Sequence, residues 1–458
     1  MIKTPREFLN QLATVLSAEQ LELRVEVLLE NSRDFGQLVG EPIMPLAVVY
    51  PGTVDDVQNI MRLAYEHHMP VISRGAGTGV SGGVHVTGEC IVLNLMRMNR
   101  ILEVRPDDEV AVVEPGVINY DLNLAVADHG LMYAPDPASY KMSTIGGNIA
   151  TNAGGLRCAK YGVTRESVLA VDVVLSDGRL IHVGRNTFKG VAGYDLTAMF
   201  TGSEGTLGVI VRAVVRLRYL PVDERDISML FPSLEAAVLG VQRIARVRVQ
   251  PAILELLDSP TIRILDEQYA TNYAVHGGAM LLVRLDGYGS EKEESVLRET
   301  FANQEVILSA SGAGDATALI EMRRTSRGDT KDDAYRMGED VAVPKSKMTG
   351  YVRELREIAY QHNVDVRVIA HAGDGNLHPT FSVEPGSGID PLARLSKALE
   401  GSIRLAIEMG GTITGEHGVG LIKREWLGWE QAPDVLSLQR EIKALFDPKN
   451  ILNPGKAF

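Results

Sequence analysis

The sequence predicts a mixed α+β protein with more than one domain. Its 458 residues exceed the roughly 100 to 200 residues that are usual for a single domain. A strand, a helix and a second strand follow one another near the start, and a further strand and helix lie beyond residue 360. No internal repeat or low-complexity tract is evident, so a repeat architecture is not expected.

The first elements lie between residues 46 and 73. Residues 46–50 (LAVVY) predict a strand, and residues 70–73 predict a second one. Between them a helix is expected to begin after Thr53, whose hydroxyl can cap it, with Asp55 and Asp56 favourable in its first turn. The apolar face of this helix would consist of Val57, Ile60, Met61 and Ala64.

A glycine run, SRGAGTGVSGG, follows the second strand at residues 73–83. Gly77, Gly79 and Gly82 complete the pattern G-x-G-x-x-G, which in a dinucleotide-binding Rossmann unit must open a helix. The next residues, VHVTGECIVLNL, predict a turn and a strand instead, so the Rossmann interpretation is excluded. Two interpretations remain: a loop whose backbone N–H groups surround an anion, or a flexible glycine loop without a ligand.

Two later stretches are also rich in small polar residues and poor in charge. They are YAPDPASYKMSTIGGNIATNAGG at 133–155 and GYDLTAMFTGSEGTLGVI at 193–210. Such composition suits a backbone held close to a large, flat, polar ligand. Between them, residues 166–183 predict a β-hairpin with Asp177-Gly178 at its turn.

The second half of the chain carries a histidine-containing hairpin motif. Val364, Val366 and Val368 alternate with polar residues, which predicts a half-buried strand ending near His371. In the following HAGDGNLH, Asp374-Gly375 suits a tight turn that would bring His378 back toward His371.

A helix and a GEHGVG motif come next. The helix is predicted from Leu392, Leu395, Leu399 and Ile403, ends at Gly410-Gly411, and is expected to be followed by a short polar strand. Two imidazoles with Glu416 could form a three-ligand metal site with open positions. The alternatives are a hairpin with exposed histidines and an ordinary polar pair of Glu416 and His417.

Charge and cysteine content limit the classes of function. The 46 Lys and Arg against 59 Asp and Glu give a net charge of −13, which opposes broad attraction to nucleic acid or anionic lipid. The two cysteines, Cys90 and Cys158, form neither a disulfide scaffold nor a CxxC pattern. No signal core or apolar run of about 20 residues is present, so a soluble cytoplasmic protein without a transmembrane segment is expected.

The motifs RGAGTGVSGG, YAPDPAS, STIGGNIATNAGG, KYG and FTGSEGTLGVI together resemble the FAD-binding domain of vanillyl-alcohol-oxidase (PCMH-type) flavoproteins. From about residue 40 to the terminal ILNPGK, the chain is similar to the family of the glycolate oxidase catalytic subunit and the D-lactate and D-2-hydroxyglutarate dehydrogenases. The resemblance implies a two-subdomain FAD-binding domain, an α/β substrate (cap) domain with an antiparallel sheet, and a C-terminal tail returning to the FAD domain. The corresponding ranges are an N-terminal helical segment at 1–42, the FAD domain at 43–221, the cap domain at 222–430 and the tail at 431–458.

The same resemblance implies a set of FAD contacts. The loop from Gly75 to Ser81 would bind the pyrophosphate, and the FAD would be noncovalent because this loop holds no histidine and His85 falls after it. The implied contacts are Arg74, Gly75, Ala76, Gly77, Thr78, Gly79, Val80, Ser81, Pro135, Asp136, Ser143, Gly146, Gly147, Asn148, Asn152, Gly154, Gly155, Tyr161, Gly205, Ile210, Glu416 and Asn453.

The relatives share the motifs HxGDGNxH and GEHGxG, which implies roles for the residues in these motifs. His371, His378 and Glu416 would bind a divalent metal, Zn²⁺ in the first place with Mn²⁺ and Fe²⁺ as alternatives, and His417 would act as the base. The implied reaction is oxidation of a small D-2-hydroxy acid to the 2-keto acid, with hydride transfer to the flavin N5.

The substrate carboxylate would be held by Asn376 and by an arginine. Where many relatives have LWxxR, this chain has ALIEMRRTSRG, which lacks the tryptophan and offers Arg323, Arg324 and Arg327; Arg323 aligns with the family residue. Gly338 stands where D-2-hydroxyglutarate enzymes have a lysine for a second carboxylate. A monocarboxylate such as lactate or glycolate is therefore favoured. A solvated helix face is the alternative reading of the arginines.

Two other classes of flavoprotein are alternatives to the dehydrogenase. A non-redox FAD transferase resembling alkyl-dihydroxyacetone-phosphate synthase would carry a triple-histidine motif, but here the pair His67-His68 lies on the first predicted helix. A noncatalytic flavin subunit that passes electrons to a partner would not need the complete set of histidines and Glu416. Because no CxxCxxC run is present, the expected acceptor is oxygen, a quinone, a cytochrome, an electron-transfer flavoprotein or an iron–sulfur subunit. A homodimer remains open, and membrane contact is expected only through a partner.

Overall fold

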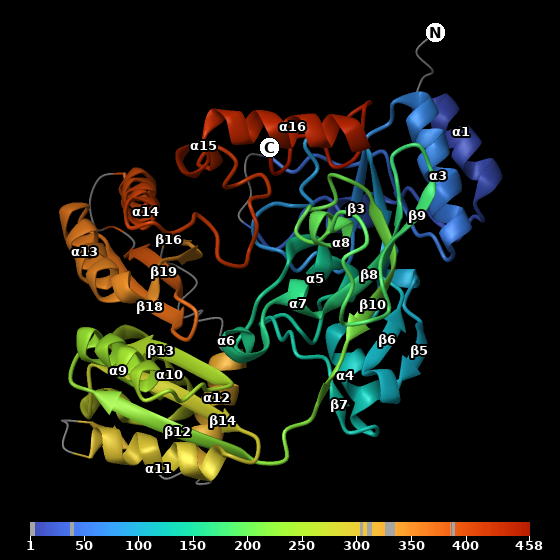
Figure 1. Cartoon of the computed structure of the whole chain (residues 1–458). Helices are drawn as coiled ribbons and strands as arrows, with labels where there is room; N and C mark the ends of the chain where they lie inside the picture. Colours follow the sequence, from blue (N-terminus) through green and yellow to red (C-terminus); the bar gives the residue numbers. More distant parts are fainter. Residues whose placement is uncertain are drawn as a thin grey trace. The chain divides into compact units, whose positions relative to one another are not determined.

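The computed structural model describes residues 5–36, 41–302, 306–308, 314–325, 335–384, 386 and 390–458. The chain forms two compact units. Unit 1 consists of Met1–Gly154, Gly162–Leu220 and Glu416–Phe458, and unit 2 consists of Gly155–Tyr161 and Pro221–Gly415. Figure 1 labels their helices and strands.

The first sheet of unit 1 has the order β1-β2-β4-β3. Strands β2 and β3 run parallel to β4, while β1 is antiparallel to β2. The predicted helix is confirmed as α3: the Thr53 hydroxyl accepts from the N–H of Asp56, whose carboxylate accepts from the N–H of Thr53. The elements are α1 (Pro5–Val15), β1 (Leu21–Glu22), α2 (Val25–Glu30), β2 (Ala47–Val49), α3 (Val54–His67), β3 (Val71–Arg74), β4 (Ile91–Asn94) and η1 (Leu95–Arg97).

The second sheet of unit 1 is antiparallel, in the order β5-β6-β10-β8-β9. The predicted hairpin at residues 166–183 is confirmed as β8 and β9, with Gly178 at φ +83 in the turn. The elements are β5 (Ile101–Arg105), η2 (Pro106–Asp108), β6 (Val110–Val113), α4 (Asn119–Ala127), β7 (Leu131–Met132), α5 (Ile145–Thr151), α7 (Thr164–Ser167), β8 (Val168–Val174), β9 (Leu180–Gly184), α8 (Leu196–Phe200), β10 (Val209–Arg216) and β11 (Arg218–Tyr219).

The C-terminal segment returns to the first sheet, as predicted. After α15 (Leu427–Glu430) and α16 (Pro433–Phe446), the N–H of Val71 donates to Ile451 O (2.7 Å) and the N–H of Asn453 donates to Val71 O (2.8 Å). Ile451 and Leu452 are buried in the apolar core formed with α1 and α3. The last residues therefore extend the sheet beside β3.

Unit 2 is built on one antiparallel sheet in the order β15-β12-β14-β13-β18-β19-β16, with β17 also paired to β19. Its elements are α6 (Cys158–Tyr161), β12 (Glu224–Phe231), α9 (Leu234–Arg246), β13 (Ile253–Asp258), α10 (Ser259–Tyr269), η3 (Tyr273–Val275), β14 (Ala279–Asp286), α11 (Ser290–Phe301), β15 (Ile307–Leu308), α12 (Gly314–Thr325), β16 (Tyr335–Gly338), β17 (Val341–Ala342), η4 (Lys345–Lys347), α13 (Met348–Gln361), β18 (Asp365–His371), β19 (Asn376–Val383) and α14 (Pro391–Glu408).

Helices cover both faces of this sheet. Helix α9 packs through Gly240 on Phe231 and Leu281, and Phe301 of α11 lies edge-on to Phe231. Helices α10 and α12 pack on the opposite side, against Met280 and Leu282, because neighbouring residues of a strand point to opposite faces. Helix α13 contacts both α9 and α14.

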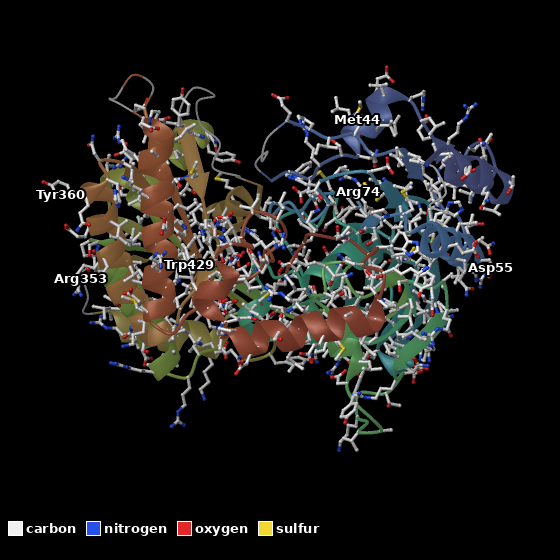
Figure 2. All side chains as sticks on the ribbon, turned by 90° about the horizontal axis from the view of Figure 1, so that it is seen from above. Met44, Asp55, Arg74, Arg353, Tyr360 and Trp429 are labelled. Atoms are coloured by element: carbon white, nitrogen blue, oxygen red, sulfur yellow. The ribbon has the colours of Figure 1, made fainter. Side chains whose placement is uncertain are left out.

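Helix α13 has one exposed face and one buried face. Arg353 and Tyr360 point away from the body of the protein (Figure 2), and Tyr360 is 82% exposed. Tyr351, Val352 and Leu355, on the other side of the helix, are buried. No helix of the described residues is long and apolar enough to cross a membrane.

The hairpin that carries the two histidines is confirmed, whereas the short strand predicted before GEHGVG is wrong. Strands β18 and β19 pair along their length, and Gly375 adopts φ +92 in the turn. Thr412 forms only an isolated bridge with Ala342. Beyond this bridge the N–H of Thr414 donates to Thr412 Oγ1 (3.4 Å) and its hydroxyl donates to the Asp340 carboxylate (2.8 Å), so no ladder continues among the described residues.

Candidate functional site

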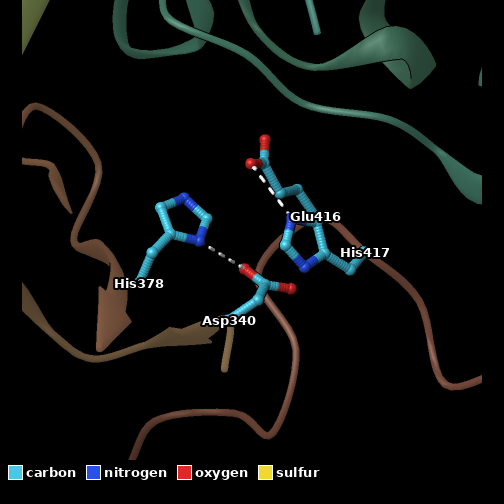
Figure 3. A group of neighbouring side chains, drawn as sticks. All are labelled: Asp340, His378, Glu416 and His417. Carbon is cyan, nitrogen blue, oxygen red and sulfur yellow. Dashed lines mark ion pairs between the residues drawn. The ribbon is translucent and has the colours of Figure 1, made fainter. Parts of the chain in front are cut away.

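Four side chains gather where the chain leaves unit 2. Asp340 lies between β16 and β17, His378 lies in β19, and Glu416 and His417 directly follow Gly415 (Figure 3). One ligand atom from each lies within 4.8 Å of the others. Asp340 is fully buried, and its bond from Thr414 ties this carboxylate to the segment just before Glu416. The donor set of two imidazoles and two carboxylates can bind a divalent cation.

His371 lies beside this cluster without belonging to it. Its ring is edge-on to that of His378, with the ring centres 5.1 Å apart. The turn of the hairpin thus brings the two predicted metal ligands together, as its sequence suggested. Asp340, in contrast, was missed, because its acidic character alone did not distinguish it from surface carboxylates.

Glu255, on β13, is the buried carboxylate next to His371. Its Oε1 lies 2.5 Å from His371 Nδ1, and its Oε2 lies 2.9 Å from Arg323 Nε. Burial alone would raise the pKa of this carboxyl, but His371 and Arg323 outweigh burial and hold the pKa below its usual range. Sequence reasoning missed Glu255, although a carboxylate flanked on both sides by apolar residues in ILELL was a signal.

The residues expected to bind the substrate carboxylate are also in unit 2. Arg323 is 8% exposed and is held by Glu255. Asn376 pairs with His371 in the hairpin and is 6% exposed, and its Oδ1 accepts no hydrogen bond from the described residues. Arg324 is buried on the same helix, and Arg327 lies outside the described residues.

In unit 1 the glycine loop leaves β3 directly. The guanidinium of Arg74 lies beneath Gly77, where an added Cβ would stand 2.1 Å from Arg74 Nη2 and the backbone has φ +71. A Cβ on Gly75 would stand 2.3 Å from Thr144 Oγ1. Glycine is therefore required at both positions, and the loop from Gly75 to Ser81 lies against the start of α5.

Near the start of α5, two buried side chains have polar atoms without a hydrogen-bond partner among the described residues. Ser143 and Asn148 are each 3% exposed, and within the described parts of the chain neither Ser143 Oγ nor Asn148 Nδ2 has a hydrogen-bond partner. Unpaired buried polar groups are costly, so they fit a ligand with polar atoms of its own. Both residues are among the expected FAD contacts, and the residues present therefore fit that cofactor.

Other expected FAD contacts are linked to this surface by hydrogen bonds within unit 1. Asn119 joins two of them, since its side chain donates to Pro135 O (3.0 Å) and its N–H donates to Ser143 O (3.0 Å). Asn453 donates to Gly83 O (2.9 Å) and Glu204 O (2.7 Å), and a Cβ on Gly205 would meet Ser73 Oγ at 2.6 Å.

The remaining expected FAD contacts of unit 1 lie in several different surroundings. Asp136 is buried, Gly146 packs on Pro115, and Asn152 ends α5 in the left-handed conformation. A Cβ on Gly154 would stand 2.5 Å from a carboxylate oxygen of Glu416. Ile210 is buried in the apolar core of β10.

Gly155 and Tyr161 belong to unit 2. The hydroxyl of Tyr161 donates to Asp286 Oδ2 (2.6 Å), and Lys160 forms an ion pair with the other oxygen of that carboxylate. Burial and this acceptor raise the pKa of Tyr161. These contacts to Asp286 fix the segment Gly155–Tyr161 at the end of β14.

Glu204 is a second functional candidate that sequence reasoning missed. Its carboxylate accepts from the N–H groups of Val419 (2.9 Å) and Gly420 (2.7 Å), directly after the GEHG motif. Burial raises its pKa despite these donors. The hydroxyl of Ser81, at the end of the glycine loop, donates to His417 O (2.9 Å). Glu204 and Ser81 therefore fix the backbone that carries Glu416 and His417.

Comparisons with known proteins identify the family of the chain. Residues 220–457 match the family model "FAD linked oxidases, C-terminal domain", and residues 45–184 match "FAD binding domain". The glycolate oxidase subunit GlcD of Bacillus subtilis is 39% identical over 422 residues, covering 91% of this chain and 89% of that protein. A D-lactate dehydrogenase of Archaeoglobus fulgidus is 37% identical, covering 89% and 90%.

Solved structures share the fold at low identity. An alkyldihydroxyacetonephosphate synthase superposes with a TM-score of 0.80 at 18% identity, covering 99% of this chain and 86% of that one. p-Cresol methylhydroxylase gives a TM-score of 0.80 at 16% identity, covering 99% and 96%. These likenesses show the fold alone. The family models and the curated relatives show that the chain is an FAD-dependent oxidoreductase and belongs to the FAD-linked oxidases.

Proposed function

We propose that this protein oxidises a small D-2-hydroxy acid to the 2-keto acid and passes the electrons to a separate acceptor. The observation that carries the proposal is the cluster of Asp340, His378, Glu416 and His417, with His371 next to His378, in a member of the FAD-linked oxidases. The relatives named above, a glycolate oxidase subunit and a D-lactate dehydrogenase, support the same class of substrate.

The cofactors would supply what side chains cannot: FAD accepts a hydride, and a divalent cation lowers the pKa of a bound hydroxyl as a Lewis acid. His371, His378 and Glu416 would hold that cation, and Asp340 stands close enough to be a further ligand or to receive a hydrogen bond from one. Imidazole and carboxylate donors suit Zn²⁺, with Mn²⁺ or Fe²⁺ as alternatives.

His417 would take the proton from the substrate's 2-hydroxyl. Its side chain is 34% exposed and its ring Nε2 lies 3.7 Å from Glu416 Oε1, so the imidazole stands next to the proposed metal ligands yet is accessible. The backbone of His417 is held by Ser81, which limits how far the ring can drift. A fixed imidazole suits proton abstraction near neutral pH.

Arg323 and Asn376 would position the substrate carboxylate. Arg323 forms an ion pair with Glu255, and a guanidinium suits a carboxylate because it can form two parallel hydrogen bonds. Gly338, at the end of β16, offers no cation for a second carboxylate. A monocarboxylate, D-lactate or glycolate, is therefore proposed over a dicarboxylate.

Unit 1 would bind FAD through the loop Gly75–Ser81 and the residues around Ser143 and Asn148. A noncovalent cofactor is proposed because His85, the histidine that follows the loop in sequence, is buried and its Nε2 lies 2.8 Å from Asp34 Oδ1. The Bacillus subtilis relative is named a subunit, which supports an electron-accepting partner for this chain. A cytoplasmic location belongs to the same proposal.

The test is anaerobic mixing of the purified flavoprotein with a panel of D- and L-2-hydroxy acids while the visible absorbance of the flavin is followed. D-lactate or glycolate should bleach the flavin, whereas L-lactate and D-2-hydroxyglutarate should do so far more slowly. An alcohol without a carboxylate serves as the negative control. A flavin that no 2-hydroxy acid reduces would disprove the proposal.

A further inference from the structure

We infer that Glu255 is a positioning residue that fixes a proposed metal ligand and the proposed substrate arginine at the same time. This inference rests on the proposed function, because His371 and Arg323 have their roles there. Glu255 touches neither the substrate nor the metal in this assignment. It acts through the two groups that it holds.

The geometry of the carboxylate carries the inference. Each oxygen serves a different partner: Oε1 lies 2.5 Å from His371 Nδ1, and Oε2 lies 2.9 Å from Arg323 Nε. Glu255 has no exposed surface, and its two partners have side chains only 8% and 10% exposed. Solvent therefore cannot replace either contact.

The backbone around Glu255 is also fixed. Strand β13 lies between β14 and β18, and Glu255 pairs directly with His371 of β18 in the register of the sheet. Three residues on, Asp258 accepts from the N–H of Val368 and from Thr261, which ties β13 to β18 and to α10. The carboxylate is held between partners on β18 and α12.

A carboxylate at Nδ1 decides the tautomer of the imidazole. With the proton on Nδ1 directed at Glu255, a metal would be held through Nε2, and the ring orientation would be fixed. Through its second oxygen the same carboxylate forms the ion pair with Arg323. One side chain thereby couples the position of the metal to that of the substrate carboxylate.

A purely structural role is the alternative. A buried carboxylate between two cationic groups could only serve to neutralise them, in which case its loss would lower stability without a specific effect on ligands. The unit offers a matched comparison: Asp226, 5% exposed, accepts from Arg284 Nε (2.7 Å) and Nη2 (2.8 Å) on the same sheet and contacts none of the proposed site residues.

The variant Glu255→Gln keeps the size of the side chain but replaces one acceptor oxygen with an NH₂ group, so it can satisfy His371 or Arg323 and not both. Zn²⁺ content should be measured on the FAD-loaded protein after dialysis against buffers of defined free Zn²⁺. Half-saturation should require about 10 to 100-fold more free Zn²⁺, the usual effect of losing such a partner.

Substrate dependence gives the second readout. With Zn²⁺ saturating, the KM of Glu255→Gln for D-lactate or glycolate should rise at least tenfold, while the limiting rate of flavin reduction falls less. Asp226→Asn should lower the melting temperature but leave Zn²⁺ binding and KM as in the wild type. Glu255→Asp, whose carboxylate is set back by one methylene, should fall between wild type and Glu255→Gln in Zn²⁺ binding.

Failure of this inference and failure of the proposed function give different results. A wild-type protein that reduces its flavin and binds Zn²⁺, together with a Glu255→Gln variant matching it in Zn²⁺ binding and KM, would refute the role of Glu255 alone. A wild-type protein that binds no stoichiometric Zn²⁺, Mn²⁺ or Fe²⁺ would refute the metal assignment and this inference with it.

Discussion

Replacing Ser143 with alanine should strengthen the FAD-free protein and weaken FAD binding. The Ser143 hydroxyl is 3% exposed and has no hydrogen-bond partner among the described residues. An unsatisfied buried hydroxyl costs about 1 to 3 kcal/mol. Ser143→Ala removes this cost from the FAD-free protein, so its melting temperature should rise by roughly 2 to 4 °C per kcal/mol. The same energy is lost from FAD binding if the cofactor satisfies the hydroxyl, which weakens the affinity about 5 to 150-fold.

Two measurements on one preparation test this reasoning: the melting temperature without FAD, and the Kd for FAD from the quenching of its fluorescence. Ser176→Ala is the matched control, since Ser176 lies in the same unit, is 1% exposed and donates to Phe446 O (2.9 Å). The control should lose about 0.5 to 1.5 kcal/mol of stability and keep its FAD affinity. If Ser143→Ala behaved as Ser176→Ala does, the hydroxyl would not be an FAD contact.

The remaining predictions concern the base, the metal, the flavin linkage and a buried lysine. His417→Asn should keep its FAD and metal but reduce its flavin about 10² to 10⁴-fold more slowly, with a deficit that shrinks as pH rises because hydroxide can take the proton; a rate within a few-fold of wild type would exclude His417 as the base. Chelation should stop flavin reduction while the melting temperature barely changes, because the ligands belong to units with their own cores; unfolding on chelation would contradict a catalytic metal. Acid precipitation should leave the FAD in the supernatant, and a yellow washed pellet would show a covalent link. Burial lowers the pKa of Lys456 to about 8, below the value of about 10.4 in an unfolded chain, so its charge destabilises the folded state below pH 8 and this cost is relieved between about pH 8 and 10.4. Lys456→Met should therefore raise the melting temperature of the FAD-free protein at pH 7 more than at pH 10, and an equal rise at both would refute the shift.

The local elements of the fold were predictable because neighbouring residues determine them. Thr53, with Asp56 three residues later, starts α3 through contacts within one turn, and Asp374-Gly375 fixes the β18–β19 hairpin in the same way. The strand expected after Gly411 fails for the opposite reason. Its backbone pairs only at Thr412, with Ala342 seventy residues earlier in the chain, and no local pattern reports that contact.

The candidate site was predictable only in part. Motif residues such as His371, His378 and Glu416 stand out in the sequence because two histidines flank a tight turn and an acid precedes a histidine in a glycine-rich segment. Glu255 does not, since its importance arises from the pairing of β13 with β18, which joins residues more than a hundred positions apart. The local sequence indicates Glu255 only as a charged residue between apolar ones.

The return of the C-terminus to β3 has a consequence for synthesis on the ribosome. Val71, shortly before the glycine loop, completes its hydrogen bonds only with Ile451 and Asn453, which leave the ribosome after unit 2. All of unit 2 between Pro221 and Gly415 is translated before those residues emerge, so it can fold while the first sheet still lacks its edge. Loading of the flavin is therefore expected only after Asn453 has emerged, and a chain stalled or clipped before Ile451 should contain a folded unit 2 and no cofactor.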